Sequence, residues 1–382
     1  MAFDVLHALF DIQSASVGAI AFTRTAENKL KIFFSQRETI SVSLTSSEDE
    51  RIVKTRLACK SLGEQMAKVL PSFPVSLGSS RAIQSATIVY SPLWSTLQPI
   101  RIDIFRDMPF LVTERFLSSL ASKEKEGIAN EHNMRMVRMS YEHVLVNGYK
   151  LQDPVGKQAN RIQGFMQVSS VHERLSSEVE RTIRSALNIH DIDEYTVGEL
   201  YAKSIAKIAS TPSGHSGLIY VDDDITSIFF IDDACVTGQS DFPAGLHHLA
   251  KELSPNDDTH SVALSLSRLG LDGVGEPQWT GSIRAKIEKH VQDWKDSFET
   301  SLRQMKSSAV VPHTFFLIGS EGSVYISEAV KEVETASYAG NHADEISMVE
   351  IGKELCAGFI DPSSPQADPA VVFAACALNT GK

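Results

Sequence analysis

The sequence predicts an α/β protein made of two related halves, with a small α+β insert in the first half. Three observations lead to this fold class. A buried strand that reaches an aspartate, turns and returns as a second strand occurs at Asp11 and again at Asp222. In both halves, later segments show the 3.6-residue period of amphipathic helices. Residues 95–168 contain segments that alternate between apolar and polar side chains as strands do, together with one short helix, which separates them from the rest of the first half.

The first half begins with three predicted strands and a helix. The strands are Val5–Phe10, Val17–Phe22 and Leu30–Ser35, with Asn28 in the turn before the third. A helical period starts after Ser46, and Ser47 and Glu50 have the spacing of a capping box. Its apolar face comprises Ile52, Leu57, Leu62, Met66, Val69 and Leu70. A further strand, "ATIVYSP", ends before Pro92.

The insert is predicted to contain three strands and one short helix. The order is a strand at Ile100–Phe105, a helix at Thr113–Ser122, a strand at Met134–Val146 and a strand in "RIQGFMQVSS". The dipeptide Asn147-Gly148 after the second of these strands is typical of a tight hairpin turn. Two helices follow, at Val171–Leu187 and in "TVGELYAKSIAKIAS", before the linker "TPSGHSG".

The second half repeats the hairpin and then becomes helical. A long amphipathic helix is expected at Ile283–Met305, with Trp294 and Phe298 on its apolar face. "HTFFLIGSEG" is a buried strand that runs into a glycine turn, and two helices, 346–359 and "PAVVFAACALN", follow. The predicted divisions are the first lobe at 1–94 and 169–212, the insert at 95–168, the second lobe at 213–345 and closing helices at 346–382.

Composition and charge exclude several classes of function. The chain is 42% hydrophobic and 22% charged, as in ordinary globular proteins, and its net charge is −12. A net negative charge disfavours binding to nucleic acid or to an anionic membrane surface, so we expect no nucleic-acid partner. No apolar run approaches the ~20 residues that span a bilayer. The start has no basic region of a signal peptide, and the four cysteines have no CxxC spacing, which indicates buried thiols in the cytoplasm.

Four stretches, in order along nearly the whole chain, resemble the actin-like ATPase superfamily. "LFDIQSASVGAIAF" is similar to its first phosphate hairpin, DIG[ST]xxV. "VDDDITSIFFIDDACVTGQSDFPAGLHHLAKEL" is similar to the second hairpin and the helix after it, and "TFFLIGSEG" to the strand and glycines of the adenosine motif. "NGYKLQDPVGK" resembles the inserted subdomain of the branch that contains the division protein FtsA and the pilus-assembly protein PilM.

The resemblance implies two actin-like lobes that face each other across a nucleotide cleft. Carried onto this sequence, the cofactor-binding residues are Asp11, Ser14, Asp222, Asp224, Thr226, Gly319 and Gly322. Asp11 and Asp222 are the candidate ligands of a Mg²⁺ ion. If the cleft is functional, the cofactors are ATP and Mg²⁺ and the activity is ATP hydrolysis.

Both hairpins depart from the pattern that phosphate binding requires. Glycines allow backbone N–H groups to approach phosphate closely, and nearby carboxylates repel it. Gln13 replaces the glycine after Asp11-Ile12, and Asp223 and Asp224 replace Ile-Gly in a second turn that aligns about two residues shorter than the family's. Ser320-Glu321 interrupts the third glycine motif. We therefore predict a degenerate ATPase without a cofactor and no catalytic residues, and we interpret the three aspartates as a solvated tight turn.

The function predicted from these features is that of a cytoplasmic scaffold. The resemblance implies that it recruits a short cytoplasmic segment of a membrane protein in pilus or division machinery, as PilM-like proteins do, or that it self-associates, as FtsA does. "PAVVFAACALNTGK" offers only Lys382 as a basic anchor, so we expect no direct membrane anchor and a peripheral location at the inner membrane through the partner. The alternative is an active Mg-ATP-binding ATPase whose nucleotide state controls assembly or self-association.

Four other features have a functional and an ordinary interpretation. His247-His248 suggests a metal, but adjacent helical residues diverge by about 100°, which favours a helix surface and groove role. Asp222, Asp224, Asp232 and Asp233 lack the pattern of a calcium loop. The stripe of Trp294 and Phe298 is more typical of a core than of a partner groove. The basic stretch Lys150–Arg161 is either a surface for an acidic partner or a solvated loop.

Overall fold

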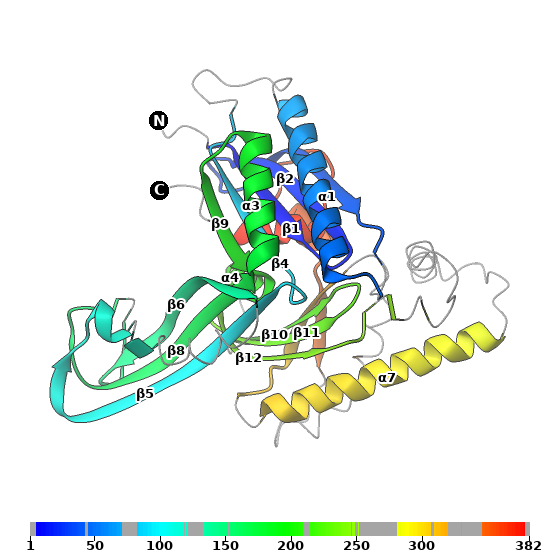
Figure 1. Cartoon of the computed structure of the whole chain (residues 1–382). Helices are drawn as coiled ribbons and strands as arrows, with labels where there is room; N and C mark the ends of the chain where they lie inside the picture. The colour runs from blue at the N-terminus through cyan, green and yellow to red at the C-terminus, as the bar shows by residue number, and fades with distance from the viewer. Residues whose placement is uncertain are drawn as a thin grey trace.

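A computed structural model of the chain contains three β-sheets (Figure 1). It describes residues 5–42, 45–70, 82–117, 119–120, 133–151, 153–208, 214–245, 247–248, 251, 281–306, 309–319, 330 and 346–378. Two of the sheets have five strands each and belong to the two halves of the sequence, and the third lies in the insert. The α/β fold class predicted from the sequence is therefore confirmed.

The first sheet has the order β3-β2-β1-β4-β9. Its strands are β1 (His7–Ile12), β2 (Ser16–Arg24), β3 (Leu30–Thr39), β4 (Ser85–Tyr90) and β9 (Asp191–Thr196). The three strands β1 to β3 are antiparallel neighbours, whereas β4 and β9 are added in parallel to β1. The four predicted strands are confirmed with ends shifted by a few residues. β9 was not predicted, because it is a short polar edge strand in which apolar alternation is weak.

The second sheet repeats this topology as β12-β11-β10-β13-β14. Its strands are β10 (His215–Val221), β11 (Thr226–Asp232), β12 (Cys235–Phe242), β13 (Thr314–Gly319) and β14 (Ser347–Glu350). The helix predicted at 346–359 is wrong: β14 pairs in parallel with β13, and only α9 (Lys353–Ala357) is helical. A short apolar run fits the two-residue period of a strand as well as the 3.6-residue period of a helix. Gly352 also disfavours a helix that continues through this point.

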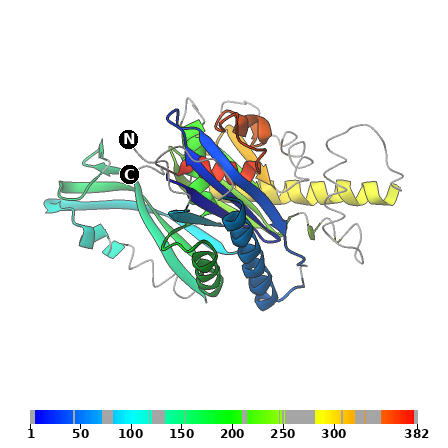
Figure 2. The same ribbon diagram turned by 90° about the horizontal axis from the view of Figure 1, so that it is seen from above.

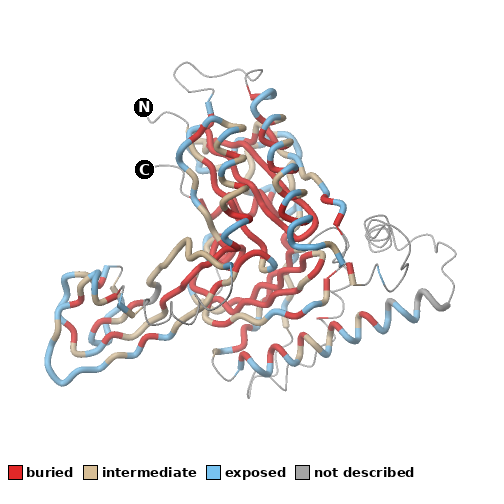
Figure 3. Tube along the Cα trace, viewed as in Figure 1, coloured by how far each residue is buried: buried red, intermediate tan, exposed pale blue. Residues whose placement is uncertain are grey.

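The third sheet, which we call the insert sheet, has the order β5-β8-β6-β7 and is antiparallel throughout. It comprises β5 (Ser95–Leu111), β6 (Met134–Val146), β7 (Tyr149–Lys150) and β8 (Gln158–His172). The predicted turn at Asn147-Gly148 is confirmed, because both residues have the positive φ of a tight hairpin, 53° and 86°. In Figures 1 and 2 the sheet projects away from the other two, and Figure 3 shows how much of its outer end is exposed.

Helices cover both faces of the first sheet. α1 (Glu48–Val69) and α3 (Glu173–Leu187) pack against one face, where a core cluster includes Phe10, Ile52 and Val179. One of the two hydrogen bonds of the predicted capping box is confirmed, since Ser47 Oγ accepts a hydrogen bond from the N–H of Glu50 at 3.2 Å. On the outer face of the second sheet lies α7 (Gly281–Lys306), whose Trp294 and Phe298 are fully buried core residues, as predicted.

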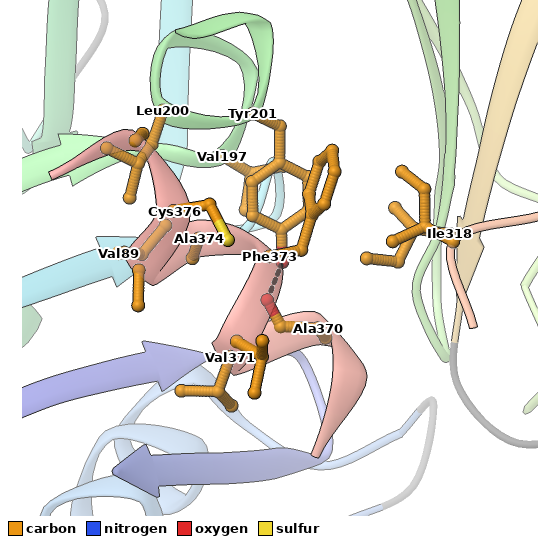
Figure 4. Close-up of a cluster of buried hydrophobic side chains, with 14 of the residues drawn as sticks. Val89, Val197, Leu200, Tyr201, Ile318, Ala370, Val371, Phe373, Ala374 and Cys376 are labelled. Atoms are coloured by element: carbon orange, nitrogen blue, oxygen red, sulfur yellow. Dashed lines mark hydrogen bonds between the residues drawn. The ribbon is translucent and has the colours of Figure 1, made fainter. Parts of the chain in front are cut away.

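The apolar space between the first two sheets is filled by α4 (Val197–Ile208) and α10 (Pro369–Ala377). Figure 4 shows side chains of α10, α4, β4 and β13 meeting in one cluster, with Tyr201 hydrogen-bonded to the carbonyl of Ala370. Because α10 is apolar on all sides and every residue from Ala370 to Ala377 is buried, it is a core element of both lobes. This shared core therefore holds the hairpin of β1 and β2 opposite the hairpin of β10 and β11.

Candidate functional site

The two predicted hairpins meet at their turns and bond directly to each other. The N–H of Ser14 lies 3.2 and 3.1 Å from the two carboxylate oxygens of Asp222, and the Ser14 hydroxyl donates to Asp222 Oδ1 at 2.8 Å. The N–H of Asp223 donates to the same oxygen at 2.8 Å. Both partners are inaccessible to solvent, with 1% of Ser14 and 0% of Asp222 exposed. The Asp222 carboxylate of the second lobe thus accepts hydrogen bonds from both the backbone and the side chain of Ser14 in the first hairpin.

A second contact joins the lobes through three charged or titratable groups. Arg51, on α1, places Nη1 2.6 Å from Asp224 Oδ2, and His247 Nδ1 lies 2.9 Å from Asp224 Oδ1. Burial alone would raise the pKa of Asp224, but the hydrogen bond to His247 and the charge of Arg51 together lower it. For His247, burial works against the charged form, yet the Asp224 bond and neighbouring carboxylates raise its pKa. The triad therefore favours an ionised Asp224 between two cations.

Asp11 belongs to a third network, on the side of the first sheet that faces α10. Its Oδ2 accepts from Arg37 Nη2 at 2.7 Å and from Gln13 Nε2 at 3.0 Å. Arg37 also contacts Asp368, the N-cap residue of α10, at 2.5 Å. Burial raises the pKa of Asp11, with Arg37 opposing the shift. The other oxygen, Oδ1, is buried and has no hydrogen-bond partner within the part of the chain that the structure describes.

The remaining predicted site residues have structural environments. Thr226 donates from Oγ1 to the carbonyl of Ala244 at 2.6 Å and accepts from Trp294 Nε1 at 3.2 Å, which ties β11 to α7. Gly319 ends β13 beside Val221. Gly322 lies outside the described residues. The structure thus brings together Ser14, Asp222 and Asp224 from the predicted set.

Two interpretations from the sequence are wrong. The aspartates are not a solvated turn, because Asp222 and Asp224 are only 0% and 8% exposed and each accepts hydrogen bonds from the first lobe. His247 is not a helix-surface residue, since it is 4% exposed and bonded to Asp224. The four cysteines are buried free thiols, as expected.

The site contains residues that the sequence analysis missed, notably Arg37 and Arg51. Arg37 on β3 is 26 residues from Asp11 and 331 from Asp368, and Arg51 on α1 is 173 residues from Asp224, so no local motif marks either arginine. One signal was present: Arg51 adjoins Ile52 on the apolar face of a predicted helix, where a charged residue is buried only when it has a partner. Asp368 could also have been found, because Asp followed by Pro is typical of a helix N-cap and first position.

The donors and charges at the turns do not fit Mg-ATP. Phosphate oxygens need free N–H groups, whereas the Ser14 N–H and hydroxyl and the Asp223 N–H already bond Asp222. A Mg²⁺ ion needs several free carboxylate oxygens, whereas Oδ2 of Asp11 is paired with Arg37 and both oxygens of Asp222 accept hydrogen bonds, which leaves only Oδ1 of Asp11 in this pair. In the described ranges, no group of three or more His, Cys, Asp or Glu side chains is arranged to hold a metal ion.

Two five-stranded sheets of the same topology around a shared helical layer, with facing hairpins, define the actin-like fold. The sequence itself matches no family profile and no curated protein. By structure, the chain is similar to one from the PilM–PilN type IV pilus biogenesis complex, with a TM-score of 0.62, 10% identity and coverage of 97% of this chain and 96% of that one. The PilM-like form of the actin-like fold is therefore present here, and the fold expected from the resemblance is confirmed.

Two further solved structures match the chain with TM-scores below 0.5. A Bacteroides thetaiotaomicron protein with the actin-like ATPase fold gives a TM-score of 0.42 at 7% identity, covering 94% of this chain and 95% of that chain. The ROK hexokinase of Thermus thermophilus gives 0.40 at 8% identity, covering 98% and 97%. No described helix is both long and apolar enough to cross a membrane.

Proposed function

We propose that this protein is an actin-like scaffold that does not use ATP and that recruits a short cytoplasmic segment of a membrane protein. The observation that carries the first part is the contact between Ser14 and Asp222. In an actin-like ATPase the corresponding turns face the phosphates of a nucleotide, whereas here the turns bond each other. Hydrogen bonds between side chains and backbone of the protein itself therefore hold the two turns together.

Electrostatics support the same conclusion. A polyphosphate that entered between the turns would meet the acidic side chains of Asp222 and Asp223, whereas the charge of Asp224 is already balanced by Arg51. Two unit charges about 4 Å apart repel by roughly 4 kcal/mol at an effective dielectric constant of 20. To bind there, ATP would also have to displace the Arg51–Asp224 ion pair, at 2.6 Å, from a buried position.

The second part of the proposal is supported by the similarity in fold to a complex of PilM with PilN. We place the partner segment at the insert sheet or in the groove beside it. There β9 forms an edge of the first sheet next to the base of β6, and sheet edges accept extended peptides. The guanidinium carbon of Arg138 on β6 lies 3.9 Å from the centre of the Tyr195 ring on β9, and the same guanidinium pairs with Asp193 at 3.4 Å, so charged and aromatic side chains line this edge. Recruitment in pilus or division machinery would hold the protein at the inner membrane, and self-association is a second interaction of this proposal.

The nucleotide part is tested by thermal melting with and without millimolar Mg-ATP. A ligand at 100 times its Kd stabilises the native state by about 2.7 kcal/mol, which is a readily measured shift in melting temperature. We expect no shift beyond that of a matched Mg-chloride and sulfate control. A nucleotide-specific shift would instead support the alternative function, an ATPase whose nucleotide state controls assembly.

The partner part is tested by site-specific photo-crosslinking in cells. A photoreactive amino acid at Asp193, on β9, samples the proposed groove, and one at Val310, exposed on the second lobe, is the matched control. We expect the Asp193 variant to crosslink to the cytoplasmic segment of a membrane protein, identified by mass spectrometry of the crosslinked peptide. Crosslinks to soluble proteins alone, or equal yields at the two positions, would contradict the proposal.

A further inference from the structure

We propose that the outer end of the insert sheet is a lipid-contact surface that fits the interface of an anionic bilayer. We call this surface the insert tip, and it comprises Phe105, Met108, Leu111 and Tyr149. The inference goes beyond recruitment by a partner segment, and it rests on that proposed function only for what brings the protein close to the bilayer.

The large apolar side chains of the insert tip are accessible to solvent. Met108 is 78% exposed, Phe105 66% and Leu111 52%, and all three lie in the outer part of β5. Tyr149, on β7, is 75% exposed. Single exposed apolar residues are normal on a protein surface, whereas a group of them in one region marks an interaction site.

Strand register places β5 and β7 side chains at the same end of the insert sheet. Phe105 pairs with Arg161 on β8, and the next β8 residue, Ile162, pairs with Val146 on β6. Val146 in turn pairs with Tyr149. Phe105 and Tyr149 therefore lie at nearly the same distance along the sheet, on the two outer strands of its described part.

The shape of the tip suits a flat, fluid surface. The regular pairing of β5 with β8 is interrupted between Phe105 and Phe110, and Met108 lies within this interruption. The insert projects from the two lobes in Figures 1 and 2, and its outer end is exposed in Figure 3. Side chains on a projection can enter a bilayer interface without a complementary groove, and tyrosine is enriched at that interface.

The distribution of charge also favours an anionic bilayer. Residues 95–168 contain ten Lys or Arg and eight Asp or Glu, a net charge of +2, although the whole chain has −12. The rest of the chain therefore carries −14. This asymmetry turns the insert toward an anionic surface and the lobes away from it. Arg106, whose guanidinium carbon lies 4.5 Å from the centre of the Phe110 ring, holds a cation within the same part of β5.

The contact is too weak to hold the protein at a membrane by itself. Even one acyl chain gives only marginal, reversible binding, and stable attachment needs a second signal. Here the partner segment supplies the first attachment and raises the effective concentration of the tip at the bilayer. The tip then determines which face of the protein is turned toward the membrane.

The experiment replaces the partner with an artificial tether. The full chain carries a terminal hexahistidine tag and binds vesicles of phosphatidylglycerol and phosphatidylethanolamine that contain a nickel-chelating lipid. A fluorescent NBD label, which brightens in an apolar environment, is attached to Met108→Cys. Val310→Cys, on the second lobe, is the matched control because Val310 is 66% exposed. The four native cysteines are buried, so the label is selective.

We expect the emission of the label at position 108 to rise about twofold or more on vesicles and to be quenched by lipids brominated in their acyl chains. The label at position 310 should show neither change. Equal changes at the two positions, or none at position 108, would overturn the proposal. A rise without vesicles that grows with protein concentration would assign the tip to a second copy of this chain, and it too would overturn the proposal.

A double variant, Phe105→Ser with Met108→Ser, tests the contact without a label. Both side chains are exposed, so its melting temperature should stay within about 2 °C of the wild type. We expect imidazole to release half of the tethered variant at a concentration about threefold or more below that for the wild type. Release at the same concentration would show that the tip contributes no binding. The tether makes this result independent of recruitment, which fails separately if Asp193 crosslinks to no membrane protein.

Discussion

Arg51 and Asp224 form a buried ion pair between the lobes, 2.6 Å apart, with side chains only 10% and 9% exposed. We predict that Arg51→Met lowers the free energy of unfolding by about 3 kcal/mol, because it leaves Asp224 buried without its main cation. Urea unfolding measures the change. The matched control is Arg56→Met on the same helix, where the Arg56–Glu178 pair at 3.7 Å is more exposed and should contribute less than about 1 kcal/mol. Equal losses in both variants would contradict a special role for the Arg51 pair.

Stability should depend on pH through His247. Its pKa in the folded protein is raised above the unfolded value of 6.5, so the stabilisation is fully present below about pH 6.5 and is lost as the pH rises through the folded pKa. Asp224, whose pKa is lowered, stays ionised over this whole range. We expect the stability difference between the wild type and His247→Gln to shrink between pH 6 and pH 9 in urea unfolding. A constant difference would mean that His247 acts only as a neutral hydrogen-bond partner.

Gly245 is predicted to be intolerant of any side chain. A Cβ at this position would lie 2.3 Å from the carbonyl oxygen of Asp223 and 2.5 Å from that of Asp222, which forces the second hairpin turn to move. We expect Gly245→Ala to destabilise the protein by about 1–3 kcal/mol, as overpacking does, and to weaken the Ser14 contact. Gly352→Ala, where a Cβ meets nothing within 4 Å, is the control and should change the melting temperature little.

Phe373 should be the most costly of the α10 side chains to truncate. It is 0% exposed and packs edge-to-face on Tyr201, with ring centroids 5.4 Å apart. Phe373→Ala is expected to lower the free energy of unfolding by about 3–5 kcal/mol through lost burial and a cavity. Phe105→Ala on the insert sheet, where the ring is 66% exposed, should stay within about 0.5 kcal/mol of the wild type. A small loss at Phe373 would show that the space between the sheets can collapse.

Local patterns in the sequence were sufficient to predict the buried hairpins and most helices. Continuous apolar runs mark the strands β1, β2, β10 and β11, and a 3.6-residue apolar period marks the helix α7. In each case this hydrophobic pattern alone is enough to assign the element. β9, β12 and β14 were missed or misassigned. β9 and β14 are short and half-exposed, and the register of β12 depends on the Asp233-Ala234 turn, where two non-glycine residues take positive φ.

The site was only half predictable for a different reason. Asp11, Ser14, Asp222 and Asp224 follow from the position of the two turns, but their partners do not. Arg51 is 173 residues from Asp224, and Arg37 is 331 residues from Asp368, so the neutralising charges come from elements that only the tertiary structure brings near. Without those partners, three consecutive aspartates favour solvent, and that is why the solvated-turn interpretation was wrong.

The position of α10 between the sheets has a consequence for synthesis on the ribosome. Arg24, at the end of β2, bonds the carbonyl of Ala375, a contact that spans 351 residues. A nascent chain can form its first hairpin early, yet the apolar face of the sheet that α10 covers stays exposed until α10 has left the ribosome. Chaperone dependence during translation should accordingly be greatest for this lobe, although its strands are made first.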